Sequence, residues 1–317
     1  MLPFLSPDTG APLRRDGDRL VADSGEQFPI VAGIPRFVPT EDYAASFGLQ
    51  WNIHSATQLD SHTGAPLSAK RLERCLGFAP ARLEGLCVFE AGCGAGRFTE
   101  VLVEAGALVH AVDLSNAVDA NRQNIGARPN YVVAQADLLR PPFPAASFDV
   151  VLCLGVLQHT PSPGASVAAL WRMVRPGGLL VFDHYTWTLS RLTKLAPLYR
   201  AVLKRLPPAR AKRITDRLVD AFFPLHWAVR RLPLAQPLLS RVSPCLSYCH
   251  LLPQLTREQH RDWCRLDTFD ELTDRYKRLR TAGWIRRTLQ RLGAGDIVAA
   301  RHNGVVEARA RRPAGAS

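Results

Sequence analysis

Apolar positions in the middle of the chain fall into short runs that alternate with amphipathic stretches. The runs are typical of buried strands and occupy residues 86–91, 108–112, 131–134, 148–154 and 179–182. The stretches between them favour three helices: one at 98–105, one that ends near 124 and one at 165–174. Apolar strands that alternate with short helices predict βαβ units, and therefore a parallel sheet with helices on both faces.

This alternation stops at residues 186–265, where apolar side chains recur at helical spacing (Ile214, Leu218 and Phe222) and prolines are expected to divide the region into short helices. Further on, a helix is predicted at 281–292 and two strands at 296–300 and 304–308. The last part of the chain is therefore expected to complete the sheet. The predicted units are an N-terminal module, lid helices, a core, a helical insertion and a closing segment (1–45, 46–85, 86–185, 186–265 and 266–317).

Charge is distributed unevenly along this chain. The 317 residues are 47% apolar, enough for a sizeable core, and carry a formal net charge of +12. The net charge is −4 over residues 1–185, +11 over 186–265 and +5 over 266–317. A basic region of this kind can bind nucleic acid, an anionic membrane or an acidic substrate, and here the helical insertion holds most of the positive charge.

The sequence predicts a cytoplasmic protein, with membrane association left open. No run of about 18 uncharged apolar residues indicates a spanning helix, and residues 1–8 lack the pattern of a signal peptide. The seven cysteines are odd in number and form no CxxC pair, as expected for free thiols in a reducing compartment.

A glycine-rich turn between a strand and a helix gives the strongest chemical signal. Gly92, Gly94 and Gly96 let the backbone approach a ligand at a helix N-terminus. A dinucleotide site favours GxGxxG, whereas the spacing here is GxGxG and Arg97 stands where the third glycine would fall. Glu90 precedes the turn and would repel a pyrophosphate but attract an ammonium group. The expected ligand therefore carries positive charge and no phosphate.

Acidic residues end the next two predicted strands. Asp113 follows the second strand, where a carboxylate can bind both hydroxyls of a ribose. Asp137 and Leu138 follow the third strand and suit an adenine amino group with an apolar flank. A ribose, an adenine and a cationic amino acid together describe S-adenosylmethionine, which is the predicted cofactor.

With these residues the chain resembles the class I S-adenosylmethionine-dependent methyltransferases, in particular their small-molecule group. The resemblance covers about residues 86–185 and 281–311. It implies an α/β fold, a Rossmann-like seven-stranded sheet with helices on both faces, here with a helical insertion. The motifs that carry the resemblance are residues 90–96, 112–115, 136–138, 148–151 with 154–159, and 175–178.

The same resemblance implies a role for each motif residue. The three glycines would pack against the methionine part, Asp113 would bind the ribose and Asp137 with Leu138 would contact adenine. Leu154 and Gly155 would form the floor beside the transferred methyl group. Beyond these, the predicted cofactor-binding residues include Leu114, Gln50 and Trp51.

Two flanking regions extend the resemblance. Residues 46–51, 58–61 and 63–64 resemble a lid in a bacterial subset of these enzymes, which also has a stretch like 266–276 before its last helix. Residues 1–39 resemble a zinc-ribbon module whose cysteine pairs are replaced by residues 6–9 and 23–25. Without thiolates a tetrahedral zinc site does not form, so a metal-free remnant is expected and no metal is predicted.

Methyl transfer to a neutral hydroxyl needs a base that works near pH 7, and histidine is the usual choice. His159 follows the fourth strand, and His184 and Tyr185 follow the fifth, all at the rim of the expected site. Each of them is a catalytic candidate, the alternative being a structural hydrogen bond or a contact with the cofactor. Candidates for the acceptor pocket are Asp267, Asp270 and Tyr276.

The basic insertion, residues 186–265, has three interpretations. It could be a helical cap over the active site with a solvated basic face, a surface that lies on an anionic membrane to reach a lipid-like acceptor, or a nucleic-acid contact. His226, His250, His260, Cys245 and Cys249 are expected to be surface or packing residues.

The favoured function is S-adenosylmethionine-dependent methylation of a small molecule, most simply at a hydroxyl oxygen. The alternative is an RNA methyltransferase that acts on a ribosomal RNA base, because a ribbon-like module also precedes such enzymes and the chain is basic. Against it, the zinc ligands are missing and the fourth strand ends in Leu154-Gly-Val-Leu157 rather than an Asn-Pro-Pro-Tyr type motif. A third possibility is a non-catalytic protein that binds the cofactor.

Overall fold

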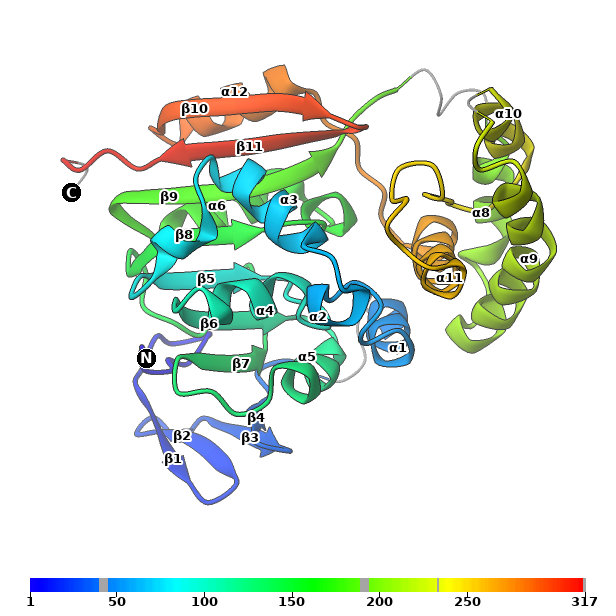
Figure 1. The fold of residues 1–317 in the computed structure, drawn as a ribbon. Helices are drawn as coiled ribbons and strands as arrows, with labels where there is room; N and C mark the ends of the chain where they lie inside the picture. The colour runs from blue at the N-terminus through cyan, green and yellow to red at the C-terminus, as the bar shows by residue number, and fades with distance from the viewer. Residues whose placement is uncertain (40–44, 189–193, 233, 316–317) are drawn as a thin grey trace.

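A seven-stranded sheet forms the centre of the computed structural model, which describes residues 1–39, 45–188, 194–232 and 234–315 (Figure 1). Parts of the predicted N-terminal module and insertion (40–44, 189–193 and 233) lie outside these residues. The strands are β5 (Cys87–Ala91), β6 (Leu108–Asp113), β7 (Tyr131–Gln135), β8 (Phe148–Cys153), β9 (Val174–Tyr185), β10 (Gly295–His302) and β11 (Val305–Arg311). Their order is β10-β11-β9-β8-β5-β6-β7, with β5 to β9 parallel and β11 antiparallel to both its neighbours. The predicted sheet is confirmed.

Helices cover both faces of the sheet because its parallel strands are apolar on both sides. One face packs against the lid and against α4 (Arg97–Glu104) and α5 (Ala117–Ile125), with Leu102 and Val118 in that core. The other face packs against α6 (Pro163–Met173) and α12 (Ala282–Arg291), through Leu170 and Leu289. This arrangement leaves the carboxyl ends of the parallel strands open to the lid and the insertion (Figure 1).

The lid segment lies across the end of the sheet that carries the glycine turn. It consists of α1 (Ala45–Ile53), α2 (Asp60–Thr63), α3 (Leu67–Leu76) and a 3-10 turn, η1 (Pro80–Leu83). α1 packs closely against the loop after β6 at Gly48. A Cβ at this position would lie 1.8 Å from Oδ1 of Asn116, so the close contact requires glycine. Asn52 Nδ2 also donates to the Asn116 carbonyl at 3.1 Å. The lid is therefore held against the loop that follows Asp113.

The insertion forms a helical cap beyond the strand ends (Figure 1). Its helices are α8 (Ala196–Leu203), α9 (Pro208–Ala228), α10 (Ala235–Val242) and α11 (Arg257–Thr273). Prolines were expected to divide the insertion into short helices, but α9 continues through Pro224, and Val219 and Phe223 just before it are buried in the core of the cap. α11 also runs across the boundary expected between residues 265 and 266.

Buried side chains give the cap a small core of its own. Val219 and Phe223 of α9 pack with three cysteine thiols, and the chain's seven cysteines are all free (Cys245, Cys249 and Cys264 in this cluster). His226 is buried and lies within 2.9 Å of both Gln236 Oε1 and Ser243 Oγ. These residues have packing roles, as the sequence suggested. Among the helices of the described residues, none combines the length and the apolar character that crossing a membrane requires.

The N-terminal module is a four-stranded antiparallel sheet, β1 (Leu13–Asp16), β2 (Arg19–Ala22), β3 (Gln27–Val31) and β4 (Ile34–Pro35). A carboxylate joins two segments of this module. Glu26 accepts hydrogen bonds from Ser6 Oγ at 2.5 Å, Thr9 Oγ1 at 2.6 Å and Ser24 Oγ at 2.9 Å. These hydrogen bonds connect the segments 6–9 and 23–25, which were expected to lack the cysteine pairs of a zinc ribbon.

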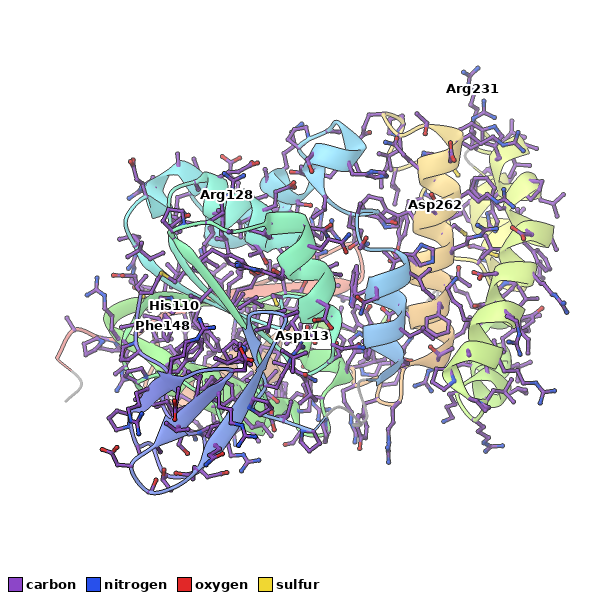
Figure 2. The ribbon with its side chains drawn as sticks, turned by 90° about the horizontal axis from the view of Figure 1, so that it is seen from below. His110, Asp113, Arg128, Phe148, Arg231 and Asp262 are labelled. Atoms are coloured by element: carbon purple, nitrogen blue, oxygen red, sulfur yellow. The ribbon has the colours of Figure 1, made fainter. Side chains whose placement is uncertain are left out.

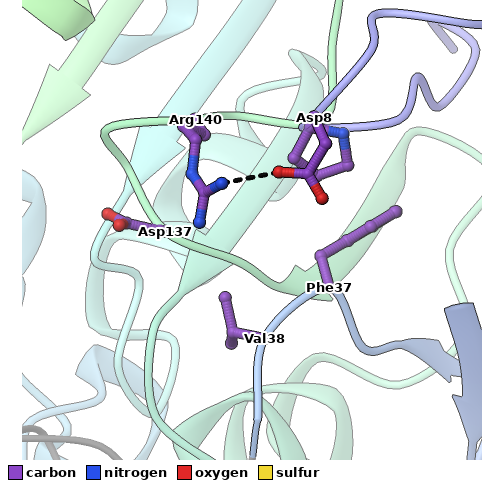
Figure 3. A pocket seen from close by; sticks show the side chains of 6 residues that line it. Asp8, Phe37, Val38, Asp137 and Arg140 are labelled. Carbon is purple, nitrogen blue, oxygen red and sulfur yellow. Dashed lines mark hydrogen bonds and ion pairs between the residues drawn. The ribbon is translucent and has the colours of Figure 1, made fainter.

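The module packs beside the β7 edge of the large sheet and the loop that follows β7. Phe37 N donates to the Gln135 carbonyl at 2.8 Å, and Asp8 pairs with Arg140 at 2.6 Å. Figure 3 shows this ion pair beside Asp137, where a small cavity of about 20 Å³ separates the module from the loop. The module therefore supports the loop that carries the predicted adenine-binding carboxylate.

Candidate active site

A cavity of about 840 Å³ lies at the carboxyl ends of the parallel strands, between the sheet, the lid and the cap. Ligands of open α/β sheets bind at this place, and the volume is within the range of small-molecule sites. The predicted cofactor residues that line it are Gln50, Trp51, Gly92, Gly94, Asp113, Leu114, Asp137, Leu138 and Leu154. The structure therefore brings most of the predicted set to one cavity.

The glycine turn needs glycine for two separate reasons. Gly92 and Gly94 have φ angles of 77° and 51°, which side chains of L-residues rarely adopt. In addition, a Cβ on Gly92 would lie 2.2 Å from Cγ2 of Val156, and one on Gly94 would lie 3.3 Å from the Trp51 ring. The turn is thus closely enclosed by the lid on one side and by the segment after β8 on the other.

Asp113 at the end of β6 is held in a fixed orientation. One carboxylate oxygen accepts from Gly94 N at 2.9 Å, and the other accepts from Ser115 N at 2.9 Å and Ser115 Oγ at 2.7 Å. Burial raises the pKa of Asp113, although these hydrogen bonds oppose the shift. The carboxylate lines the cavity next to the glycine turn, as a ribose-binding residue requires. Figure 2 shows it on the side of the sheet toward the cap.

Two predicted cofactor residues do not line the cavity. Glu90 lies beneath the glycine turn, where its Oε2 accepts from Thr99 Oγ1 at 2.6 Å, and burial raises its pKa to about 8. Gly96 has a φ of 103° at the start of α4, where a Cβ would lie 3.3 Å from Ile125. Both residues therefore support the glycine turn from the side away from the cavity.

His159 lies in the short turn η2 (Leu157–His159) and lines the cavity. Its Nδ1 is 3.1 Å from Oδ2 of Asp274 and 3.3 Å from the carbonyl of Tyr276, whereas its Nε2 is 3.9 Å from Oδ2 of Asp270. Burial lowers the pKa of His159, but the carboxylates of Asp270 and Asp274 outweigh burial, and the net shift is upward. With Nδ1–H donated to the Tyr276 carbonyl, the Nε2 lone pair of the neutral imidazole is available to a ligand.

His184 and Tyr185 end β9 but have different surroundings. Tyr185 lines the cavity, makes an edge contact with the His159 ring at 5.5 Å, and burial raises its pKa. His184 does not line the cavity: its ring lies 6.4 Å from that of Trp284 on α12. Successive strand residues point to opposite faces, so only Tyr185 reaches the site. The catalytic role expected of His184 is not retained.

Of the three acceptor-pocket candidates, Asp267 and Asp270 line the cavity and Tyr276 does not. Burial raises the pKa of Asp267 to about 7, with the neighbouring Asp270 adding to the shift. Burial likewise raises the pKa of Asp270 to about 6, although His159 opposes it. Tyr276 contributes through its backbone carbonyl, which faces His159.

The set His159, Asp270 and Asp274 also has the spacing of a metal site, since one ligand atom from each lies within 4.8 Å of the others. Cations of the protein already neutralise this set, however. Arg200 Nε lies 2.8 Å from Asp274 Oδ1, and Lys277 Nζ lies 3.5 Å from Oδ2. The arrangement fits a buried ion-pair network around an imidazole better than a divalent-cation site.

Part of this chain is similar in sequence to known proteins. Residues 89–182 match the family model described as a methyltransferase domain. The chain is 37% identical over 118 residues to a ubiquinone biosynthesis O-methyltransferase from Paraburkholderia phymatum and 37% identical over 135 residues to one from Pseudomonas putida. The matched regions are 36% and 40% of this chain, and they span about half the length of these relatives (49% and 56%).

Residues 89–182 of this chain form a methyltransferase domain.

Solved structures of other methyltransferases resemble the chain more distantly. Magnesium protoporphyrin IX methyltransferase from Synechocystis PCC 6803 is 18% identical with a TM-score of 0.45, covering 85% of this chain and 97% of that one. Human N-acetylserotonin methyltransferase is 14% identical with a TM-score of 0.46, covering 87% and 60%.

The sequence-based predictions did not include some residues that lie at this cavity or beside it. Arg97 was noticed only as a departure from glycine spacing, yet it lines the cavity, stacks near Trp263 and has a pKa that burial lowers to about 10. Asp183 accepts from Gly155 N at 2.7 Å and pairs with Arg71, so it joins the cavity floor to the lid. The period-two pattern of β9, which puts residues 183 and 185 on one face, could have indicated Asp183.

Proposed function

We propose that this protein transfers a methyl group from S-adenosylmethionine to a hydroxyl oxygen of a small molecule. The observation that carries the proposal is that His159, whose Nδ1 lies 3.1 Å from Oδ2 of Asp274, lines the same cavity as Asp113 and the glycine turn. A base and a cofactor cradle in one cavity are what hydroxyl methylation requires. The name O-methyltransferase borne by the two relatives supports oxygen as the acceptor atom.

The residues of the cavity suit the proposed cofactor in charge and in shape. When bound, S-adenosylmethionine supplies a methyl group on a positively charged sulfur. Asp113 would hold the ribose hydroxyls with oxygens already oriented by Gly94 and Ser115, and Asp137 would face the adenine. Trp51 lies against Gly94 and would exclude water from the methionine part.

The acceptor would occupy the part of the cavity nearest His159. Nε2 of His159 would take the hydroxyl proton as the oxygen attacks, and the negative charge of Asp274, 3.1 Å from Nδ1, would stabilise the resulting imidazolium. Tyr185 would hold the imidazole ring at its edge. Alignment of the acceptor oxygen with the methyl group accounts for much of the rate in such displacements.

The RNA methyltransferase alternative has weaker support. The matched relatives carry the name of a small-molecule pathway, and the glycine-turn cavity is roofed by the lid, since Gly48 and Trp51 of α1 lie against Asn116 and Gly94. The expected lipid-like acceptor and the expected membrane contact depend on the exposed surface of the cap and not on the lid.

The test uses purified protein, cofactor labelled on the methyl group, and three acceptor pools: a soluble metabolite extract, a lipid extract and total RNA. We expect label in a small-molecule fraction, and we expect His159→Ala to lower the rate by about 100-fold or more while cofactor binding persists. Label in RNA alone would favour the alternative. Calorimetric binding without transfer to any pool would favour the non-catalytic interpretation.

A further inference from the structure

The outer side of the cap exposes an unusual concentration of large apolar side chains. Leu198, Leu234 and Leu238 are 67%, 79% and 61% exposed, and most of the exposed large apolar residues of the described chain belong to the cap. α8 and α10 are neighbours, since Leu195 N donates to the Arg241 carbonyl at 2.8 Å. The residues that we call the α8/α10 face are Leu195, Leu198, Val202, Leu234, Leu238 and Val242.

Helical spacing shows that these side chains are grouped. Residues 198 and 202 on α8, and residues 234, 238 and 242 along α10, recur every four positions, so each set lies along one side of its helix. Single exposed leucines are ordinary on protein surfaces, whereas a contiguous apolar face marks an interaction site. We therefore expect the α8/α10 face to bind an apolar partner.

Positive charge accompanies this face. Lys204, Arg205, Arg231 and Arg241 are exposed and flank the apolar residues in sequence. The sequence has only two acidic residues between 186 and 256, and both are already paired: Asp216 with Lys212 at 2.5 Å, and Asp220 with Arg261 and Arg265 at 2.7 and 2.8 Å. Within the part of the chain that the structure describes, Lys204, Arg205, Arg231 and Arg241 form no ion pair with an acidic side chain, so they can bind an anionic partner. Figure 2 shows Arg231 at the outer end of the cap, far from Asp113.

Leucines surrounded by cations suit an anionic bilayer better than RNA. A membrane takes apolar side chains into its acyl boundary while its headgroups pair with Lys and Arg. RNA recognition instead uses phosphate contacts together with stacking on exposed aromatic rings, and the α8/α10 face is aliphatic.

The cavity reaches this face. Lys194 and Ala196, just before and at the first residue of α8, line the cavity, and so does Leu251, which is exposed. Leu195 lies between the first two and belongs to the face. The lining of the cavity and the apolar face therefore share one short segment.

We propose that the α8/α10 face docks on an anionic phospholipid membrane, and that the acceptor is a hydroxyl compound with an apolar chain which reaches the cavity from the bilayer. Docking is independent of the proposed function, whereas the acceptor class rests on it. Docking of this kind is peripheral, driven by insertion of leucines and by charge, and it needs no spanning helix.

The test of docking is flotation of the full chain with vesicles of phosphatidylcholine alone and of phosphatidylcholine mixed with phosphatidylglycerol. We expect binding to the anionic vesicles only. Leu198→Ser/Leu238→Ser should weaken it at least tenfold (about 1.4 kcal/mol), because two leucines no longer insert into the acyl boundary of the bilayer. The matched control Val31→Ser/Val298→Ser, on surface strands away from the cap, should bind as the unchanged protein does.

Charge and competition complete the experiment. Lys204→Glu/Arg205→Glu should also reduce flotation, whereas Arg14→Glu/Arg15→Glu on the N-terminal module should not. Failure to bind anionic vesicles, or equal binding by the leucine variant and the unchanged protein, would overturn docking. Binding that RNA displaces and that the leucine variant retains would replace the membrane with nucleic acid.

A separate readout distinguishes the two proposals. Methyl transfer to a lipid extract, presented in anionic vesicles, should be faster than to the same extract in neutral vesicles, and the leucine variant should lose that difference. Flotation together with transfer only to soluble metabolites would overturn the acceptor class and leave docking intact. Flotation with no transfer to any pool would count against the proposed function itself.

Discussion

Nδ1 of His159 lies 3.1 Å from Oδ2 of Asp274, a carboxylate that is fully buried and whose pKa is lowered. Burial alone would raise that pKa, but the hydrogen bond with His159 and the nearby Lys277 and Arg200 outweigh it. The pair joins the turn after β8 to the end of α11. It therefore couples the proposed base to the cap.

This pair predicts the pH dependence of methyl transfer. The pKa of His159 is raised, and the imidazole accepts a proton only above that pKa, so the rate should fall as pH decreases through it. Asp274→Asn removes the charge that favours imidazolium, so the falling limb should move to lower pH and the plateau rate should decrease. Rates measured across pH, with Asp220→Asn as a control that leaves the profile unchanged, check this. An unshifted profile in Asp274→Asn would contradict the role of the pair.

Cofactor affinity should depend on Asp113. Asp113→Ala removes a carboxylate that is positioned for two ribose hydroxyls, and hydrogen bonds to a charged group contribute about 1.5–3 kcal/mol each. We expect calorimetry to show S-adenosylmethionine bound at least roughly tenfold more weakly. Asp23→Ala, an exposed change on the N-terminal module, should bind normally. Equal affinity in the two variants would be incompatible with the cofactor site described.

The glycine turn should tolerate no side chain at its first position. Gly92→Ala adds a Cβ that would lie 2.2 Å from Val156, in addition to the strain of a φ of 77°. Gly126→Ala has the same strain, with a φ of 73°, but nothing within 4 Å of its Cβ. Both should lower the melting temperature through strain of about 1–3 kcal/mol, and Gly92→Ala should also lose most cofactor binding. Retained binding in Gly92→Ala would show that the turn does not enclose the ligand.

The N-terminal module should respond to acid and not to chelation. Hydrogen bonds from Ser6 and then Thr9 lower the pKa of Glu26, so the carboxylate stabilises the module above its unfolded pKa and this contribution is lost as pH falls through the lower folded value. Glu26→Ala should increase hydrogen exchange in residues 6–31 at pH 7 and have little effect at low pH. A chelator should leave exchange unchanged, and a chelator effect would indicate a metal site.

Local signals in the sequence predicted the sheet, the glycine turn and Asp113, because each depends on a strand, a turn and a residue that are adjacent in the chain. Position in the sequence gave His184 and Tyr185 the same expected role. The alternation of side chains along β9 distinguishes them, because it directs only Tyr185 into the cavity. The pairs that connect distant segments, His159 with Asp274 and Arg71 with Asp183, were not predictable, since each depends on how the lid and cap pack on the core. Pro224 was misleading for the same reason: packing of α9 on α11 outweighs its local preference.

The contact between the N-terminal module and β7 has a consequence for self-association. β7 is the outermost strand at its end of the sheet, and an open strand edge can template pairing with another chain. Arg36 forms a parallel bridge with Gln135, and Phe37 N donates to the Gln135 carbonyl. The chain therefore supplies its own partner for this end of the strand edge. The N-terminal module would thereby protect this end of the sheet against aggregation.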